Sequence, residues 1–196
     1  MVVIFCLLFL AFNWAYAQVQ ERPSAAEIGS IQVYLTPAQA RAKIFPQAVR
    51  FEREIHAIPP ALKVRIGKNW GRVFDGDSLE VYIAYGAGGS LLGYASISEE
   101  IGKYRPITFM VGIGADLEIG GAAILVYRES RGGEVRRSRF LRQYRGKSSA
   151  DPIRINRDII NITGATLSVR ALNFGIKKQL VLVEAFYGQP EGSETP

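Results

Sequence analysis

Apolar residues recur along the chain with two different spacings, and these predict two kinds of secondary structure. Within residues 166–187, apolar positions are separated by four, four and three residues, the spacing of one face of an α-helix. Four shorter segments are instead rich in β-branched and aromatic residues, with glycine-bearing turns between them. These segments are residues 79–85, 91–97, 107–113 and 122–128. We therefore expect a long C-terminal helix and a four-stranded antiparallel meander.

Shorter helices are expected on either side of this meander. Thr36 is suited to the N-cap of a helix over residues 35–46, with Pro37 in the first position and Gln39 completing a capping box. A second short helix is expected to begin at Pro59-Pro60 and to end at Gly67, and residues 133–145 return to helical spacing. The pattern predicts a single α+β domain, with an antiparallel sheet covered by helices on one face.

Composition is that of an ordinary globular protein, with 48% hydrophobic and 21% charged residues among 196, which excludes a disordered or multi-span membrane protein. Residues 1–17 carry no charge and end in Ala15-Tyr16-Ala17, the small-x-small pattern of a signal peptidase site. We expect export and cleavage before Gln18. The alternative is an uncleaved membrane anchor, although residues 2–17 would reach only about 24 Å as a helix.

Cysteine and histidine are too scarce for the common metal and haem sites. Cys6, the only cysteine, lies in the apolar start, so the mature chain lacks the thiols of c-type haem, iron–sulfur and most structural zinc sites. We expect no metal site. The single histidine, His56, has no second histidine or orienting carboxylate pattern beside it, and we expect it to be a solvent-side loop residue.

Positive charge is concentrated between Arg128 and Lys147. Eight basic residues stand there against Glu129 and Glu134, a surplus equal to the net charge of the whole chain, +6. The segment is interpreted either as a solvated helix face or as a surface for an acidic partner or anionic lipid headgroups. Nucleic acid fits poorly, because no reading helix or set of stacking aromatic residues accompanies the charge.

The segment TGATLS, residues 163–168, places three hydroxyl side chains at the start of the long helix. One interpretation is that Thr163 or Thr166 simply caps the helix. The other is that Gly164 and Ala165 leave the backbone accessible, so that free N–H groups and the helix dipole bind a phosphate. A hydroxyl in this place could carry a phosphoester.

TGATLS resembles the [S/T]GAT signature of the FMN-binding domain family, which includes subunits of the sodium-translocating NADH:quinone reductase and of the Rnf electron-transport complex. The segments YLTPAQARAKIFP, LLGYASI, ITFMVGI, AILVYRES and RFLRQYRGKSSADPI follow the order of that family. The resemblance implies that a flavin transferase attaches FMN to Thr166 through a phosphoester, outside the cytoplasm. It also implies roles for neighbours: Thr163, Gly164, Ala165 and Leu167 shape the phosphate turn, Ser168 donates to a phosphate oxygen, and Arg128 and Glu129 lie near the isoalloxazine ring.

Where many members of the family have an acidic residue, three positions before the first hydroxyl of the motif, this chain has Ile160, and Asp158 is the nearest acid. Even so, we expect residues 18–188 to be an exported FMN-binding domain, followed by a flexible tail at 189–196. It would pass electrons between membrane or envelope partners, in the periplasm or on the outer face of the cytoplasmic membrane, rather than act as a stand-alone catalyst. The alternative is a cofactor-free envelope module that binds or assembles through the basic segment.

Overall fold

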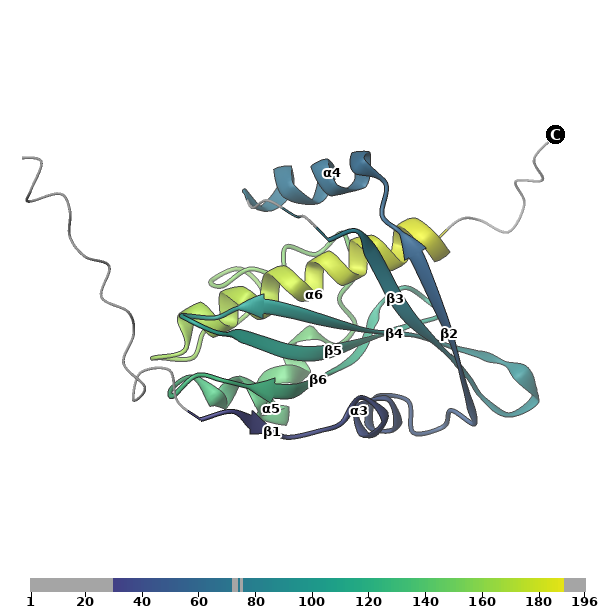
Figure 1. Cartoon of the computed structure of the whole chain (residues 1–196), viewed down its shortest axis with the longest axis horizontal. Coiled ribbons are helices and arrows are strands. Elements are labelled where there is room, and N and C mark those ends of the chain that lie inside the picture. Colours follow the sequence, from purple (N-terminus) through teal and green to yellow (C-terminus); the bar gives the residue numbers. More distant parts are fainter. Residues whose placement is uncertain (1–29, 72–73, 75, 189–196) are drawn as a thin grey trace, which may run out of the picture.

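The computed structural model of the chain describes residues 30–71, 74 and 76–188 (Figure 1). The expected signal segment, residues 1–17, and the expected tail, residues 189–196, lie outside the described residues. None of the helices in the described part is long and apolar enough to cross a membrane.

Six strands form one antiparallel sheet in the order β1-β6-β5-β4-β3-β2 (Figure 1). The strands are β1 (Gln32–Val33), β2 (Arg50–Ala57), β3 (Ser78–Tyr85), β4 (Leu91–Ile101), β5 (Pro106–Gly114) and β6 (Ile119–Tyr127). Strands β3 to β6 confirm the predicted meander. The glycine-rich connection between β3 and β4 contains a 3₁₀ turn, Ala87–Gly89, and is a hairpin turn as expected.

The long helix α6 (Thr166–Tyr187) is confirmed, and it packs across one face of the sheet. Helix α3 (Pro37–Ile44) is also confirmed, with Thr36 as N-cap and the complete capping box. It lies on the opposite face, where Ala40 and Phe45 pack in a separate core cluster with Met110. The expectation that helices cover only one face is therefore wrong. Gly112 of β5 allows the end of α3 to approach that second face closely, because a Cβ atom there would collide with Ile44.

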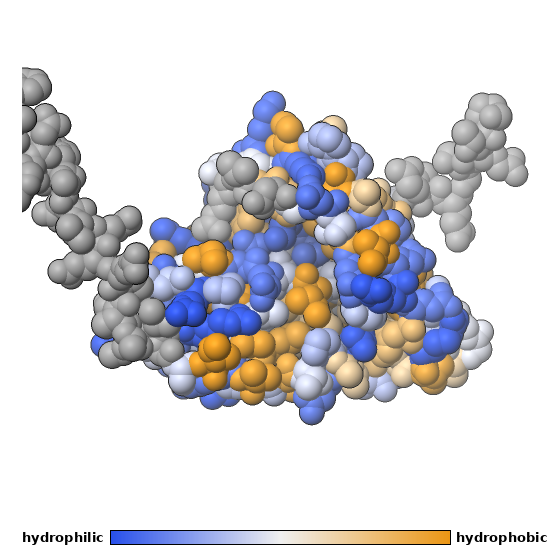
Figure 2. All heavy atoms as spheres, viewed as in Figure 1, coloured by the Kyte–Doolittle hydropathy of each residue, from blue (hydrophilic) through white to orange (hydrophobic). Residues whose placement is uncertain are grey.

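Helix α3 covers only part of its face. Val33 of β1 pairs with Val126 of β6 and remains 67% exposed, and Ile31 is 64% exposed. In Figure 2, apolar side chains gather over the lower part of the molecule, where Figure 1 has β1, β5 and β6. The opposite face, under α6, holds the larger core.

Two helical predictions need correction. Helix α4 (Pro60–Trp70) continues through Gly67 and ends at Gly71, which adopts the left-handed conformation with φ 60°. Residues 133–145 form three short pieces instead of one helix: a 3₁₀ turn at Gly133–Arg136, helix α5 (Ser138–Leu141) and a 3₁₀ turn at Arg142–Tyr144. The extended backbone of Arg137, with ψ 132°, separates the first two pieces, while buried Val135 and Tyr144 fix the ends of the segment in the core.

Candidate functional site

A cleft of about 520 Å³ opens at the beginning of α6, beside the segment that follows β6. Its lining comes from three separate parts of the chain and consists of Lys103, Glu129, Ser130, Arg131, Gly164, Ala165, Thr166, Leu167 and Ser168. The structure thus brings Glu129 and residues 164–168 of the predicted site together. Thr163 is exposed, and neither it nor Arg128 lines this cleft.

The turn before α6 places Thr166 among the residues that line this cleft. Gly164 has φ 80°, which favours glycine, and the Ala165 N–H donates to the Ile162 carbonyl at 2.9 Å to close the turn. Ala165 is the N-cap residue and no described side chain caps the helix, so the interpretation of Thr163 or Thr166 as a cap is wrong. The first N–H groups of α6 therefore have no side-chain cap, and together with the helix dipole they suit an anion.

The Thr166 side chain is held by one neighbour within the described residues. Its Oγ1 accepts a hydrogen bond from Asn161 Nδ2 at 2.8 Å. The other polar atom of this amide, Asn161 Oδ1, is buried and has no hydrogen-bond partner among the described residues. Leaving such an atom unpaired typically costs about 1–3 kcal/mol. The orientation of this amide, with Nδ2 toward Thr166, is therefore unusual for a buried polar group.

Ser168 lines the cleft, but its hydroxyl is hydrogen-bonded to the buried hydroxyl of Tyr127. The buried Tyr127 hydroxyl donates to the Arg131 carbonyl at 2.5 Å and lies 2.9 Å from Ser168 Oγ, so that Ser168 donates to Tyr127. Burial is the main cause that raises the pKa of Tyr127 to about 12, which keeps the phenol protonated at neutral pH. Ser168 therefore ties α6 to β6, and its expected donation to a phosphate stays a prediction.

Glu129 holds the β4–β5 turn, which carries Lys103, beside the cleft. Its buried carboxylate accepts the backbone N–H groups of Tyr104 at 2.7 Å and Arg105 at 3.0 Å. These bonds hold the turn against the segment after β6 and bring Lys103 to the cleft. Sequence reasoning missed Lys103 and Tyr127, since neither belongs to the motif, and the contacts that place them join segments far apart in the chain.

Arg128 lies away from the cleft. Its guanidinium donates to the Pro106 carbonyl at 2.9 Å and to Thr108 Oγ1 at 2.8 Å, and pairs with Glu99 at 3.7 Å. Thr108 is two residues from Met110 on β5, so it shares the α3 face of the sheet. The position of Arg128 therefore gives no support to the expected contact with a ring bound at the cleft, and Arg131 is the arginine that lines it.

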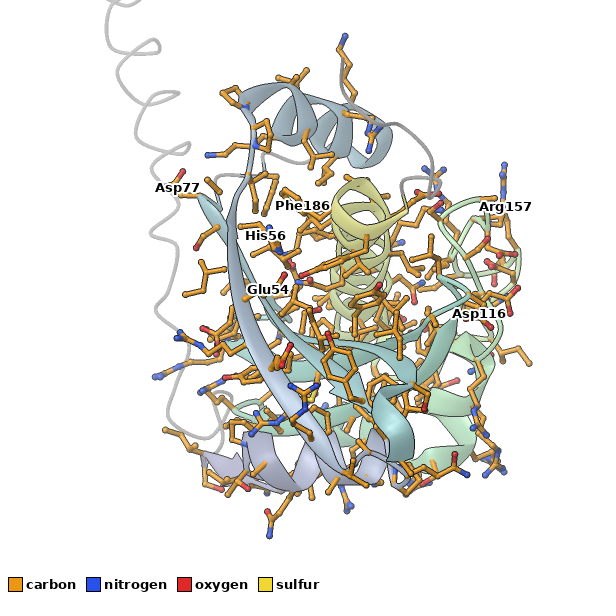
Figure 3. The ribbon with its side chains drawn as sticks, turned by 90° about the vertical axis from the view of Figure 1, so that its right-hand side faces the viewer. Glu54, His56, Asp77, Asp116, Arg157 and Phe186 are labelled. Atoms are coloured by element: carbon orange, nitrogen blue, oxygen red, sulfur yellow. The ribbon has the colours of Figure 1, made fainter. Side chains whose placement is uncertain are left out.

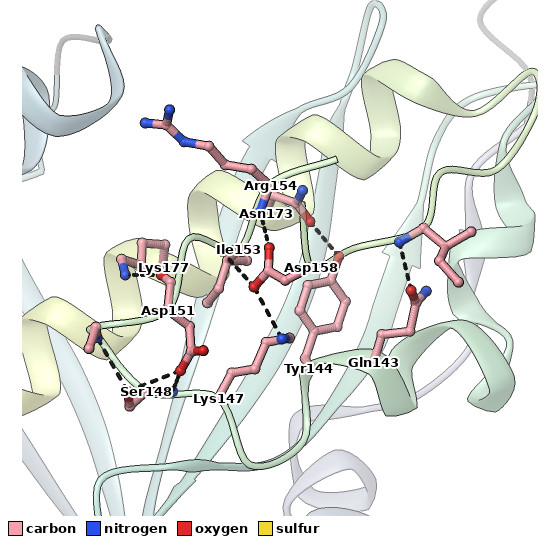
Figure 4. Close-up of polar contacts among 12 residues, drawn as sticks. Gln143, Tyr144, Lys147, Ser148, Asp151, Ile153, Arg154, Asp158, Asn173 and Lys177 are labelled. Atoms are coloured by element: carbon pink, nitrogen blue, oxygen red, sulfur yellow. Dashed lines mark hydrogen bonds and ion pairs between the residues drawn. The ribbon is translucent and has the colours of Figure 1, made fainter. Parts of the chain in front are cut away.

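An ordered loop brings the chain from residue 145 to the turn (Figure 4). Asp158 pairs with Lys147 at 3.1 Å and accepts the N–H groups of Ile153 and Arg154 at 3.0 and 2.8 Å. Partial burial would raise the pKa of Asp158, but the Arg154 N–H and then Lys147 outweigh it, and the pKa is lowered. Asp158, the acidic residue nearest to the motif, therefore stabilises the loop through these contacts.

His56 lies on strand β2, and the expectation of a loop residue without a carboxylate partner is wrong. Its Nε2 is 3.1 Å from Glu54 Oε2 and 2.7 Å from the Tyr187 hydroxyl, and its ring stacks on Phe186. Figure 3 shows Glu54, His56 and Phe186 close together beside the end of α6. This cluster stands at the C-terminal end of α6, whereas the cleft opens at its N-terminal end.

Comparison with known proteins agrees with this geometry. Residues 102–181 match the FMN-binding domain family, so the resemblance is confirmed over that segment, which contains every residue that lines the cleft. NqrC of Shewanella oneidensis shares the fold with a TM-score of 0.51 and 14% identity, over 75% of this chain and 86% of that chain. A subunit of the Na⁺-translocating NADH-quinone reductase of Parabacteroides distasonis has a TM-score of 0.53 and 15% identity, over 81% and 87%. At such identities the likeness is one of fold. No curated protein sequence matches significantly.

Proposed function

We propose that this FMN-binding domain carries its FMN covalently, through a phosphoester on Thr166, and passes electrons between membrane or envelope redox partners. The observation that supports this most directly is the position of Thr166, which lines the cleft and stands in the first turn of a long helix whose N-terminus has no side-chain cap among the described residues.

The residues of the cleft fit this group. The N–H groups of the first turn and the positive end of the helix dipole would bind the phosphate, while Lys103 and Arg131 supply positive charge nearby. The negative charge of Glu129 is compensated by two backbone N–H donors, which weakens its repulsion of a phosphate. The Asn161 amide donates to Thr166 and leaves its own Oδ1 unpaired among the described residues, an arrangement that favours a role of Asn161 at the attachment site over a role in helix packing alone.

Attachment balances if flavin adenine dinucleotide is the donor. A bond forms between Thr166 Oγ1 and the phosphorus on the FMN side, the pyrophosphate bond breaks, AMP leaves, and the hydroxyl proton is released. A flavin transferase would catalyse this step. Ile160, where many relatives have an acid, is 77% exposed, so the transferase would meet an apolar side chain there.

When bound, the flavin supplies the electron chemistry, and the protein provides the tether, the phosphate site and the surrounding charge. A covalent tether suits an exported carrier, because FMN that dissociated outside the cytoplasm would be lost. The periplasm or the outer face of the cytoplasmic membrane is accordingly the location that we propose, and the chain would not act as a stand-alone catalyst.

The test is the intact mass of the exported protein after coexpression with a flavin transferase. We expect wild type and Thr163→Ala to gain the mass of FMN less one water, and Thr166→Ala to gain nothing. Thr163→Ala is the matched control, since it removes the other threonine hydroxyl of the motif from an exposed position outside the cleft. No added mass on wild type would contradict the proposal and favour the cofactor-free envelope module.

A further inference from the structure

We propose that Asn161 is a positioning residue for the phosphoester, which holds Thr166 Oγ1 in one orientation both before and after attachment. The inference rests on the proposed function of Thr166. It starts from the 2.8 Å hydrogen bond between Asn161 Nδ2 and Thr166 Oγ1, and from the unpaired Oδ1 of the same amide.

The direction of this hydrogen bond matters for the chemistry. A threonine hydroxyl has two lone pairs and one hydrogen. The Asn161 N–H occupies one lone pair, which leaves the second lone pair to attack phosphorus and the hydrogen to pass to a proton acceptor. The oxygen of the resulting ester has no hydrogen but keeps its lone pairs. The same bond from Asn161 can therefore persist in the product.

The opposite orientation of the amide would serve only the free hydroxyl. If the amide turned by 180°, Oδ1 would accept the Thr166 hydrogen, and that bond would be impossible once the oxygen is esterified. In the structure the amide instead presents Nδ2 to Thr166 and leaves Oδ1 buried without a partner among the described residues. Unpaired buried polar groups are uncommon, and this one accompanies an orientation that suits the ester.

The backbone around Asn161 is fixed independently of this contact. The Ile160 N–H donates to Gln143 Oε1 at 2.8 Å, and the turn that follows is closed by the bond from Ala165 to Ile162. Asn161 is not the N-cap of α6, since that position belongs to Ala165. Its side chain is therefore available for orienting Thr166.

The first experiment follows FMN attachment by mass, using the full exported chain, a flavin transferase and flavin adenine dinucleotide. We expect Asn161→Ala and Asn161→Asp to attach FMN at least about tenfold more slowly than wild type, because misorientation of a reacting group can lower a rate by two orders of magnitude. Aspartate keeps the size of asparagine but has no N–H for the ester oxygen.

Gln143→Ala is the matched control, because it removes a hydrogen bond from the same segment without touching Thr166. We expect its rate to stay within about twofold of wild type, well short of the loss predicted for a misoriented hydroxyl. An unchanged rate in Asn161→Ala, an equal loss in Gln143→Ala, or faster attachment to Asn161→Asp would each overturn the positioning role. In all three cases wild type still carries FMN, so the proposed function would stand.

A second measurement needs no flavin. Side-chain NMR of the flavin-free protein should show one χ1 rotamer for Thr166 in wild type and rotamer averaging in Asn161→Ala. Thr166→Val, which lacks the hydroxyl, should shift the side-chain amide resonances of Asn161. Averaging in wild type would overturn the inference by itself. If wild type shows one Thr166 rotamer but accepts no FMN, the proposed function is overturned. The positioning role of Asn161 in attachment is then overturned as well.

Discussion

At the scale of single residues, Gly132 allows the start of α6 to lie against the segment after β6. It adopts φ 86°, and a Cβ atom there would stand 2.7 Å from the Tyr127 hydroxyl and 2.9 Å from Ser168 Oγ. Both atoms belong to the hydrogen-bonded group that ties β6 to α6. A side chain at this position would therefore strain the backbone and collide with the side chains of Tyr127 and Ser168.

We predict that Gly132→Ala lowers the free energy of unfolding by roughly 1–3 kcal/mol, measured by denaturant titration of the flavin-free protein. Gly133→Ala is the control, since its Cβ would meet Tyr127 at an ordinary 3.8 Å and its φ is not positive. Similar losses in the two variants would mean that the contact with Tyr127 and Ser168 does not decide stability.

At the scale of elements, the loop between residue 145 and α6 depends on Asp158. This carboxylate joins Lys147 to the backbone of residues 153 and 154, and so shapes the path that ends at the Thr166 turn (Figure 4). Its folded-state pKa lies below the ordinary 3.8. The stabilisation from its charge is therefore complete above pH 3.8 and is lost as the pH falls through the lower, folded-state pKa.

We predict that Asp158→Asn lowers stability at neutral pH by roughly 1–2 kcal/mol and that its difference from wild type shrinks as the pH falls below 4. Thermal unfolding of both proteins between about pH 2.5 and 7 measures this. Lys147→Met should cost less, since it removes the ion pair but leaves the two backbone bonds to Asp158. A constant difference across the pH range would contradict the role of the charged form.

The elements that the sequence predicts well are those whose signals are local. The capping box at Thr36, the glycine-bearing turns of the meander and the apolar spacing of α6 each lie within a few residues. Strand β2 was missed because its residues, RFEREIHA, include four charged side chains, three of them consecutive, and so lack the alternating apolar pattern of a strand. Such a composition is tolerated because β2 is an edge strand of the sheet. Helix α4 continues past Gly67 because one glycine costs a helix only about 1 kcal/mol.

The residues of the site likewise divide into those with a local sequence signal and those placed by contacts between distant segments. TGAT is a local motif that can be recognised in the sequence, and its last three residues, Gly164, Ala165 and Thr166, line the cleft. Lys103 and Asn161 reach this region through contacts that spacing does not reveal. The side chain of Arg128 turns to the α3 face immediately after β6, while Arg131 lines the cleft. No periodic pattern fixes the direction of side chains just beyond a strand end.

At the scale of the whole molecule, the positive surplus of the basic segment is divided between the two faces of the sheet. Arg128 pairs with Glu99 on the α3 face, and Lys147 pairs with Asp158 in the loop. Arginine side chains between residues 131 and 145 are exposed, from the edge of the cleft along α5. A flavin at the cleft would therefore stand in a field to which Arg131 contributes at the site and Arg128 only from the other face.

This division predicts different effects of two similar substitutions on the flavin potential. Positive charge favours the anionic reduced forms, so Arg131→Gln should lower the midpoint potential of the first one-electron reduction by ~20–40 mV, the energy of a unit charge about 10 Å away at an effective dielectric constant of 40–80. Arg128→Gln removes a charge that lies outside the cleft, on the α3 face of the sheet, and should change it by less than about 10 mV. Spectroelectrochemical titration of the flavinylated proteins measures both shifts. A larger shift for Arg128→Gln would place the ring on the α3 side, and equal shifts would mean that the field at the flavin is set by net charge alone.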